Sequence, residues 1–255
     1  DGANINFFNI ETDNTGIVSP SEPRILWYPL KNAFLAGQVL ILKPDSVGLN
    51  SVATGYESRA VGAQSQAMGY QAVARGDYST AIGKNALARK NNSFAFGDAA
   101  KAMNQDSYAF GAFTEAQGLG SFAFGYVGRD SLGPTSAVTK ALGNYSFAFG
   151  LGAQTGAAAE GAFAIGSGTA ANGPFSLAMG YKSASSDYYS VAIGNQAQAT
   201  QGSSAIGNYA VATGKNSFSV HGYASGSRSI SIGDFSSAYG GSAIAIGGFY
   251  YHTDV

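Results

Sequence analysis

The 255-residue sequence contains no cysteine, two histidines and one tryptophan. Without cysteine there can be no disulfide bond, thiolate metal ligand or cysteine nucleophile. Charged residues make up only 11% of the chain, against about 25% in an average protein, and the formal net charge is −1. Nucleic-acid-binding proteins usually carry a basic excess, and disordered chains have few aromatics, whereas 13% of this chain is aromatic. These counts argue against nucleic-acid partners and against disorder.

Long hydrophobic runs are also missing. No stretch approaches the 18 or so apolar residues that a membrane-spanning helix needs. The chain begins Asp1-Gly2-Ala3, without a charged and then apolar leader. We therefore expect a mature or excised piece of a protein, and the lack of cysteine fits an exported one. It would not insert into a membrane itself, and its anchor would lie outside this segment.

The residues that build catalytic sites are sparse and scattered. His221 and His252 are far apart in the sequence, and neither Glu115 nor Glu160 has an evident carboxylate partner. There is no phosphate-binding loop and no glycine-rich calcium repeat. We therefore predict no enzymatic activity, no cofactor and no metal. His221 stands at a turn where glycine is expected; three copies meeting in an oligomer would make an anion or metal site, but a local turn variation is the favoured interpretation.

What the sequence has in abundance is glycine, 36 residues, together with alanine and serine. These residues form a repeated unit, Ser-x-Ala-x-Gly, first seen at residues 51–55. Most repeats follow one another at 14 residues, and about 14 units are present; the step from Gly125 to Gly150 is longer, at 25 residues. The predicted turn glycines, taken as position 0 of each unit, are Gly55, Gly69, Gly83, Gly97, Gly111, Gly125, Gly150, Gly166, Gly180, Gly194, Gly207, Gly233 and Gly247.

Each unit has the pattern of two short strands. Positions −3 and −1 are bulky, as at Phe94 and Phe96, and position −2 is almost always alanine. Positions +3 and +5 are small, as at Ala86 and Ala88. Both segments alternate with a period of two, which is typical of strands, and glycine permits a tight turn between them. Polar residues and glycine at positions +6 to +9 predict the return turn. Repeated in register, such coils stack into an all-β, parallel β-solenoid.

A 14-residue coil encloses a thin interior, and two arrangements are open. The bulky −3 and −1 ladder points into the roll, or it faces outward with an interior made of alanine. We favour the inward ladder. Either arrangement leaves an uncharged strip on the outside, which predicts an oligomer with closed symmetry. A monomeric solenoid with a neutral surface is the alternative.

Two segments, 79–88 and 190–200, resemble the head repeats of YadA-like trimeric autotransporter adhesins. The resemblance extends over about residues 46–248. It implies a left-handed parallel β-roll of 14-residue coils, a homotrimer and an extracellular location on the bacterial cell surface. The sequence departs from the family pattern at His221 and at an insertion predicted at about 128–144. No coiled-coil heptads or membrane-barrel segment follow the repeats.

The first 45 residues differ from the repeats and are expected to form an N-terminal cap or tip with short strands. Segments 4–10 and 39–42 have strand patterns, and 13–16 has a turn pattern. A cap would cover the exposed strand edges at the end of a solenoid. A receptor-binding tip is the alternative, with Trp27 and Tyr28 as anchors or, in a cap, as core.

The same region carries a second resemblance. Residues 26–37 are similar to the lead-in of repeat-containing surface or fibre proteins of Bacteroidetes-type bacteria. At the other end, residues 249–255 are expected to form a C-terminal tail.

The predicted function is a non-enzymatic adhesin head, a rigid rod that binds host, matrix or other cell surfaces through a protein or glycan receptor. The alternative is a trimeric fibre of a phage or contractile injection system, which neighbouring tail genes would reveal. The sequence names no ligand. The candidate surface residues, besides those of the cap, are Arg129, Asp130 and Lys140 of the insertion and the +1 residues Tyr56, Tyr70, Tyr126 and Tyr181, which alternatively only stack along the roll.

Overall fold

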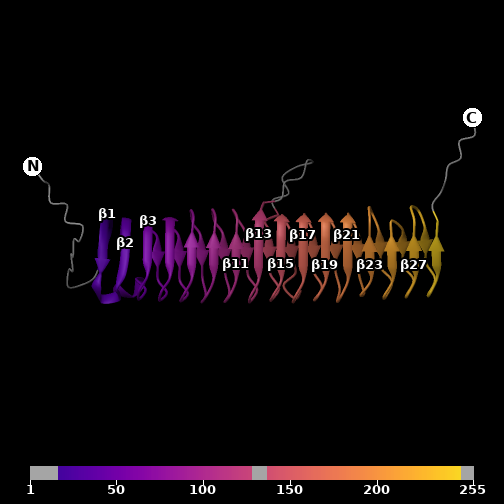
Figure 1. The fold of residues 1–255 in the computed structure, drawn as a ribbon, viewed down its shortest axis with the longest axis horizontal. Coiled ribbons are helices and arrows are strands. Elements are labelled where there is room, and N and C mark those ends of the chain that lie inside the picture. Colours follow the sequence, from indigo (N-terminus) through magenta and orange to yellow (C-terminus); the bar gives the residue numbers. More distant parts are fainter. Residues whose placement is uncertain (1–16, 128–136, 248–255) are drawn as a thin grey trace, which may run out of the picture. The chain divides into compact units, whose positions relative to one another are not determined.

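A computed structural model of the chain describes residues 17–127 and 137–247. The fold is an all-β solenoid of about 15 turns with about 14 residues in a coil, which confirms the prediction from the repeat. The chain divides into two compact units, Asp1–Gly120 and Ser121–Val255. In each unit, successive coils pair in parallel through two sheets (Figure 1). We call the sheet that carries positions −3 to −1 the front sheet, and the sheet that carries +4 and +5 the back sheet.

In the first unit, the front sheet begins with a hairpin and continues through the coils. Its strands are β1 (Val18–Tyr28), β2 (Ala33–Ile41), β3 (Val52–Tyr56), β5 (Gln66–Tyr70), β7 (Thr80–Ile82), β9 (Phe94–Phe96) and β11 (Tyr108–Phe110). The back strands are β4 (Arg59–Ala60), β6 (Val73–Ala74), β8 (Leu87–Ala88), β10 (Lys101–Ala102) and β12 (Glu115–Ala116). Two short 3-10 helices, η1 (Pro29–Lys31) and η2 (Pro44–Ser46), flank β2.

The second unit repeats the two-sheet arrangement. Its front strands are β13 (Phe122–Tyr126), β15 (Phe147–Leu151), β17 (Phe163–Ser167), β19 (Leu177–Tyr181), β21 (Val191–Asn195), β23 (Ser204–Ile206), β25 (Phe218–Val220), β27 (Ile230–Ile232) and β29 (Ile244–Ile246). Its back strands are β14 (Lys140–Ala141), β16 (Gln154–Thr155), β18 (Ala170–Ala171), β20 (Ala184–Ser185), β22 (Gln198–Ala199), β24 (Val211–Ala212), β26 (Tyr223–Ala224) and β28 (Ser237–Ala238).

The interior of the coil is built from alanine and small hydroxyl residues. In one coil, the inward-facing residues are Ser146, Ala148, Ala153 and Thr155. Each has at most 1% of its surface exposed. The neighbouring Phe149 is 54% exposed, so the inward bulky ladder that the pattern favoured is wrong and the ladder faces outward. Sheets packed through ordinary side chains lie about 10 Å apart, whereas short turns hold these two sheets close enough for small residues only.

Glycine at position 0 meets two demands at once. Gly150 has φ 132°, a conformation that other residues rarely adopt. A Cβ on Gly150 would also lie 2.2 Å from the carbonyl oxygen of Gly166 in the next coil. Serine at position −4 closes the return turn, since the Ser146 hydroxyl donates a hydrogen bond of 2.7 Å to the carbonyl oxygen of Gly143. The repeated Ser-x-Ala-x-Gly motif therefore combines turn closure, interior packing and close coil stacking.

Both corners of the coil also contain a residue in the left-handed conformation, at positions +2 and +9. Examples are Asn85 (φ 55°) and Asn92 (φ 54°). Aromatic residues occupy the same positions elsewhere, as at Tyr78 (φ 58°) and Phe113 (φ 59°). The repeat pattern predicted a positive φ only at the turn glycines. Non-glycine residues in this conformation are uncommon, so the corners use repeated but mildly strained positions.

A hairpin covers the start of the first coil. β1 pairs antiparallel with β2, and β2 pairs in parallel with β3. The predicted strand at 39–42 thus belongs to the longer strand β2, while segments 4–10 and 13–16 lie outside the described residues, as does the tail 249–255. The hairpin occupies the strand edge that β3 would otherwise expose.

Candidate binding surfaces

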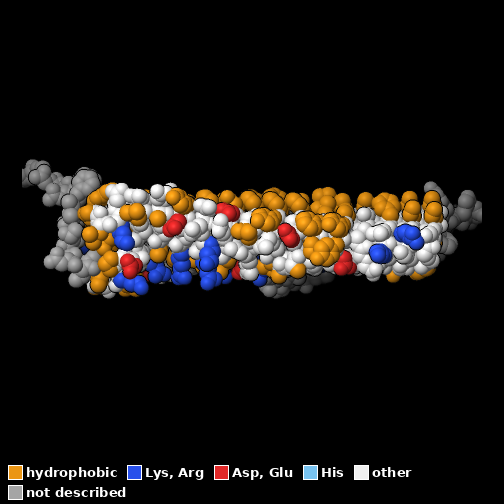
Figure 2. Space-filling model, turned by 90° about the horizontal axis from the view of Figure 1, so that it is seen from below, with side chains coloured by type: hydrophobic (Ala, Val, Ile, Leu, Met, Phe, Trp, Pro, Cys, Tyr) orange, Lys and Arg blue, Asp and Glu red, His pale blue; other side chains and the backbone are white. Residues whose placement is uncertain are grey.

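An apolar ladder runs along the outer face of the front sheet in the second unit. The ring of Phe147 stacks between those of Phe122 and Phe163, with centroids 4.9 Å apart on both sides. Beside them, Phe124 and Phe149 stack at 5.0 Å. Figure 2 shows such a row of hydrophobic side chains running from coil to coil. The outer ladder, as we call it, comprises Phe122, Phe124, Phe147, Phe149, Phe163, Ile165, Leu177, Met179, Val191, Ile193, Ile206, Phe218, Val220, Ile230, Ile232, Ile244 and Ile246.

The outer ladder is too large to be an incidental patch. A buried aromatic side chain removes roughly 150–250 Å² from water, so the five Phe rings of β13, β15 and β17, which are 37–54% exposed, leave on the order of 400 Å² of apolar surface. The largest apolar patch of a typical monomer is about 300–600 Å². Three coils already reach that size, and the ladder continues through the remaining front strands without a charged residue.

In the first unit, the corresponding face is apolar only in its later coils. Phe94 and Tyr108 stack at 5.1 Å, and Phe96 and Phe110 lie 6.3 Å apart in a tilted arrangement. The earlier coils carry polar residues in the same column, including Gln66. The first unit therefore has a shorter apolar ladder.

The four +1 tyrosines do not form one ladder. Tyr56 and Tyr70 stack face to face, with centroids 4.8 Å apart and planes at 7°, so the stacking alternative holds for this pair. Tyr126 instead stands in register with a leucine, and Tyr181 with a serine and an asparagine. The ammonium group of Lys182 lies 5.2 Å from the Tyr181 ring centroid, a cation–π contact. All four rings are exposed.

The two predicted anchors of the N-terminal region point in opposite directions. Trp27 is 38% exposed, whereas Tyr28 is 5% exposed. Tyr28 is therefore core and not a surface-binding residue, because successive residues of β1 face opposite sides of the hairpin. Leu30, in the turn that follows, is exposed and was not predicted.

The insertion is shorter than predicted at its C-terminal end. Lys140 lies within β14 and pairs in register with Gln154 of β16, so it belongs to a regular coil. Thr139, just before it, is buried and donates a hydrogen bond of 2.7 Å to the carbonyl oxygen of Gly150. Lys140 is half-buried. Arg129 and Asp130 lie outside the described residues.

A basic surface on the back sheet of the first unit was not predicted. Arg59 and Arg75 line a groove of about 380 Å³ together with Glu57. Nearby in the same sheet, the Lys101 ammonium lies 3.1 Å from the Glu115 carboxylate. Figure 2 shows Lys and Arg side chains gathered over the early coils. The near-zero net charge of the whole chain gives no sign of this surface. It is found only when the residues of the back strands are compared coil by coil.

The coil at His221 has a shortened turn in the second unit. Val220 pairs with Ile206 of the preceding coil, and Tyr223 pairs with Val211. Between these two pairs the preceding coil has four residues, but the short coil has only two, beginning with His221. His221 takes the left-handed conformation, with φ 55°. Its amide N–H donates to the Ile206 carbonyl oxygen at 3.0 Å, the same hydrogen bond that Gly207 and Gly233 make at position 0. His221 therefore stands at position 0, and the residues at positions +1 and +2 are missing.

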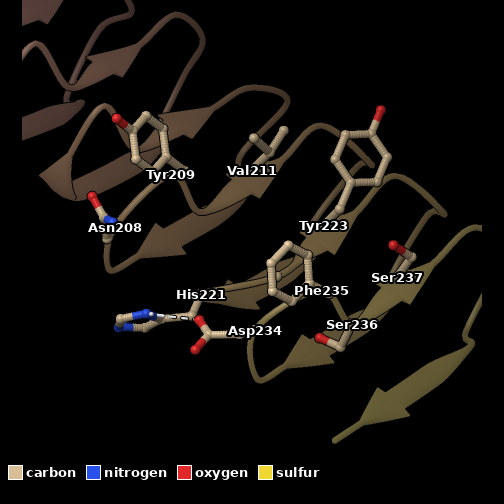
Figure 3. Close-up of a pocket in the computed structure, with 10 residues that line it drawn as sticks. Asn208, Tyr209, Val211, His221, Tyr223, Asp234, Phe235, Ser236 and Ser237 are labelled. Carbon is tan, nitrogen blue, oxygen red and sulfur yellow. Dashed lines mark ion pairs between the residues drawn. The ribbon is translucent and has the colours of Figure 1, made fainter. Parts of the chain in front are cut away.

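His221 bridges the gap that this deletion leaves. A Cβ on Gly207 would lie 2.3 Å from the Cδ2 atom of His221, so the imidazole lies against the backbone of the preceding coil. On the other side, Nδ1 of His221 lies 3.4 Å from Oδ1 of Asp234 in the following coil (Figure 3). Because the turns before and after are full length, a pocket of about 450 Å³ opens over the short turn. Its lining is Asn208, Tyr209, Val211, His221, Gly222, Tyr223, Asp234, Phe235, Ser236 and Ser237.

The repeat identifies the family. The YadA head domain repeat (2 copies) matches residues 46–70, 60–86, 104–126, 157–183, 171–197, 186–201, 201–220 and 224–249, which together cover more than half of the chain. The chain belongs to this family. Its members are adhesin-like fibre heads, and YadA-like heads are homotrimeric. No curated protein matches the sequence.

The matched segments of the YadA head repeat leave particular residues out. Residues 221–223, the short turn of the His221 coil, fall between two matched segments. Residues 127–156 are also unmatched and include the insertion. Residues 87–103, which include the regular strands β8, β9 and β10, are unmatched as well.

No group of three or more metal-ligating residues occurs in the described part of this YadA-like head. His221 has one acidic neighbour, Asp234, which fits the turn-variation interpretation better than a metal site within one chain. No helix among residues 17–127 and 137–247 is long and apolar enough to cross a membrane.

Proposed function

We propose that this chain is the head of a non-enzymatic, homotrimeric adhesin on a bacterial surface, where it binds host, matrix or other cells. The observation that carries the proposal is the uncharged outer ladder, exposed along the second unit. Burying such a surface against other copies is the usual solution for an apolar face of this size. The YadA head family supports three copies in particular.

In the proposed trimer, the outer ladders of three chains face a common axis. Burial of apolar surface stabilises association by about 25 cal/mol for each Å² removed from water. The aromatic part of each ladder, on the order of 400 Å², would therefore contribute about 10 kcal/mol per chain before the entropy of association is subtracted. The back sheet and the coil corners would remain accessible to a receptor.

We propose three surfaces for receptor contact. The stacked pair Tyr56 and Tyr70 offers two parallel exposed rings, Trp27 offers an exposed indole at the hairpin, and Arg59 and Arg75 offer positive charge. Aromatic residues and arginine are the side chains most often found at binding hot spots. The receptor itself is proposed to be an extracellular protein or glycan.

The first test is the mass of the protein in solution. Light scattering is expected to give about three times the 26.0 kDa mass of the chain. A stable, folded monomer would refute the trimer. For adhesion, beads coated with the trimer are expected to be retained on matrix-coated surfaces more strongly than albumin-coated beads; equal retention on every matrix and cell surface tested would overturn the adhesive role.

A further inference from the structure

The pocket at the short turn has the form of a slot between two aromatic residues. Tyr209 stands at position +2 of the coil before the short one, and Phe235 at position +2 of the coil after it, both with left-handed backbones (φ 53° and 59°). Adjacent coils are about 4.8 Å apart, so these two residues are about 10 Å apart. The coil between them has no residue at position +2, because its turn is two residues short. The missing part of the turn leaves space for one flat ring between Tyr209 and Phe235.

Phe235 is unusual among the apolar side chains of this protein. It is 83% exposed, more than any other large hydrophobic side chain in the described ranges. Its left-handed backbone is the one that corner residues share throughout the solenoid, so it is the exposure of Phe235 that sets it apart. An apolar ring held in water at a corner is available to stack on a ligand. The Tyr209 hydroxyl on the opposite wall accepts a hydrogen bond of 3.3 Å from Gln196, which helps to orient that ring.

Besides Val211, Gly222 and Tyr223, the rest of the lining is polar and close to neutral. Asn208 and Asp234 extend from the two flanking turns, and Ser236 and Ser237 follow on the far side (Figure 3). The Asn208 amide and the Ser237 hydroxyl can donate and accept hydrogen bonds, and the Asp234 carboxylate accepts them. The Ser236 hydroxyl already donates a hydrogen bond of 2.8 Å to the Gly233 carbonyl oxygen. No lysine or arginine lines the slot, and its one carboxylate, that of Asp234, already faces His221.

We propose that this slot binds one neutral hexopyranose residue of a glycan. The aromatic walls would stack on the apolar faces of the sugar ring, while Asn208, Asp234 and the Ser237 hydroxyl would bind its hydroxyl groups. The volume of about 450 Å³ lies within the usual range of ligand pockets, about 300–1,000 Å³. An anionic ligand is disfavoured because the lining has a carboxylate and no lysine or arginine. A purely apolar ligand would leave the polar wall groups without hydrogen-bond partners.

This inference deepens the proposed adhesive function, on which its biological role rests, by naming the class of ligand. The two-residue deletion supports it, because the deletion opens a space that a full-length turn would fill.

The test is binding of a panel of methyl hexopyranosides and methyl N-acetylhexosaminides to the full chain, measured by saturation-transfer NMR and titration. At least one glycoside is expected to receive magnetisation on its ring protons. Phe235→Ala and Tyr209→Ala are each expected to lower its affinity about tenfold, the upper end for one aromatic contact. Tyr188→Ala is the control, because Tyr188 is 61% exposed but does not line the slot.

A second variant fills the slot. Inserting Gly-Asn between Val220 and His221 gives this turn the length and sequence type of the turn after Ile206. Binding is expected to fall below detection while the far-ultraviolet circular dichroism spectrum is retained. If the insertion unfolds the protein, Phe235→Ala still tests sugar binding, because removal of this exposed ring leaves the packed interior untouched.

The proposal is overturned if no glycoside of the panel binds, or if Phe235→Ala and Tyr209→Ala bind as well as the unmodified chain. Sugar binding and oligomerisation are measured separately. A monomer that binds the glycoside would refute the trimer and keep the slot, whereas a trimer that binds none would refute the slot and keep the trimer.

Discussion

At the scale of single residues, the coil is governed by how little space it encloses. Position 0 tolerates no side chain because the backbone of the next coil lies where a Cβ would stand, and positions −4, −2, +3 and +5 accept only small side chains. Larger residues are therefore confined to the outer face and the corners. This division explains how a chain so rich in glycine, alanine and serine also carries 16 phenylalanines and 15 tyrosines.

The ladder of turn glycines predicts a strong effect for Gly150→Ala. The substitution combines an unfavourable backbone conformation, which costs about 1–3 kcal/mol, with a Cβ placed 2.2 Å from the Gly166 carbonyl oxygen. We expect the melting temperature to fall by about 6–12 °C, measured by circular dichroism, since 1 kcal/mol shifts a protein of this size by about 2–4 °C. Gly247→Ala is the matched control, because Gly247 has φ 145° but nothing within 4 Å of the added Cβ. Equal losses from both variants would contradict the role of coil contact.

The outward direction of the ladder predicts opposite tolerances at neighbouring positions. Ala148→Leu adds a bulky group to a site that is 1% exposed, and such overpacking costs about 1–3 kcal/mol or more. Phe149→Leu, one residue further along the same strand, keeps an apolar side chain on the outer face and is expected to leave the unfolding free energy within about 1 kcal/mol of the unmodified protein. Denaturant titration measures both. A larger loss from Phe149→Leu than from Ala148→Leu would mean that the ladder faces inward.

Ala148 and His221 show which features of the fold could be predicted from the sequence and which could not. The alternation around Ala148 established two faces of a strand, but alternation alone cannot say which face is inside; the width of the gap between the sheets decides that. His221 was recognised as a replacement of glycine at position 0, and its backbone hydrogen bond to Ile206 confirms that place. The two-residue deletion that follows it was not predicted, although the 12-residue step from His221 to Gly233 had signalled it in the spacing. The pocket itself needs the flanking turns in three dimensions.

At the scale of elements, the β1–β2 hairpin differs from every coil because it is antiparallel and packs larger residues. Its buried residues include Leu26, Leu35, Val39 and Ile41, in place of the alanines of the coils. It also covers the backbone of β3, which otherwise begins the parallel ladder. These two properties are what a cap requires, because exposed strand edges promote association with other chains.

Deleting residues 1–43 is therefore expected to cause aggregation. The deletion removes β1 and β2 and leaves the edge of β3 unpaired. Turbidity and size-exclusion chromatography would detect the aggregates, and deletion of residues 1–16, which keeps the hairpin, serves as the control. A truncated chain that stays monodisperse with an unchanged melting temperature would show that the hairpin is not a cap and would leave the tip function of Trp27 as its explanation.

At the scale of the whole molecule, the interior, the outer ladder and the remaining surface of the solenoid have different roles. The interior holds the coil together with small residues, the outer ladder offers an uncharged face for self-association, and the corners and back sheet carry the polar and aromatic variation. Substitutions at the corners therefore change recognition without disturbing the coil, and the His221 turn is such a change. A repeat fold tolerates this because each coil depends mainly on its neighbours.

The same separation predicts that assembly can be broken while the coil remains folded. Phe122 lies on the outer ladder and is 37% exposed in the single chain, so Phe122→Asp leaves the alanine interior intact. In a trimer with threefold symmetry, the substitution would place three carboxylates in an apolar interface, and each unpaired buried charge costs several kcal/mol. Light scattering is expected to show the mass of a single chain, with the β-sheet circular dichroism spectrum retained. Tyr188→Asp adds the same charge to an exposed residue outside the ladder and is expected to remain trimeric; a normal trimer carrying Phe122→Asp would exclude the outer ladder as the trimer interface.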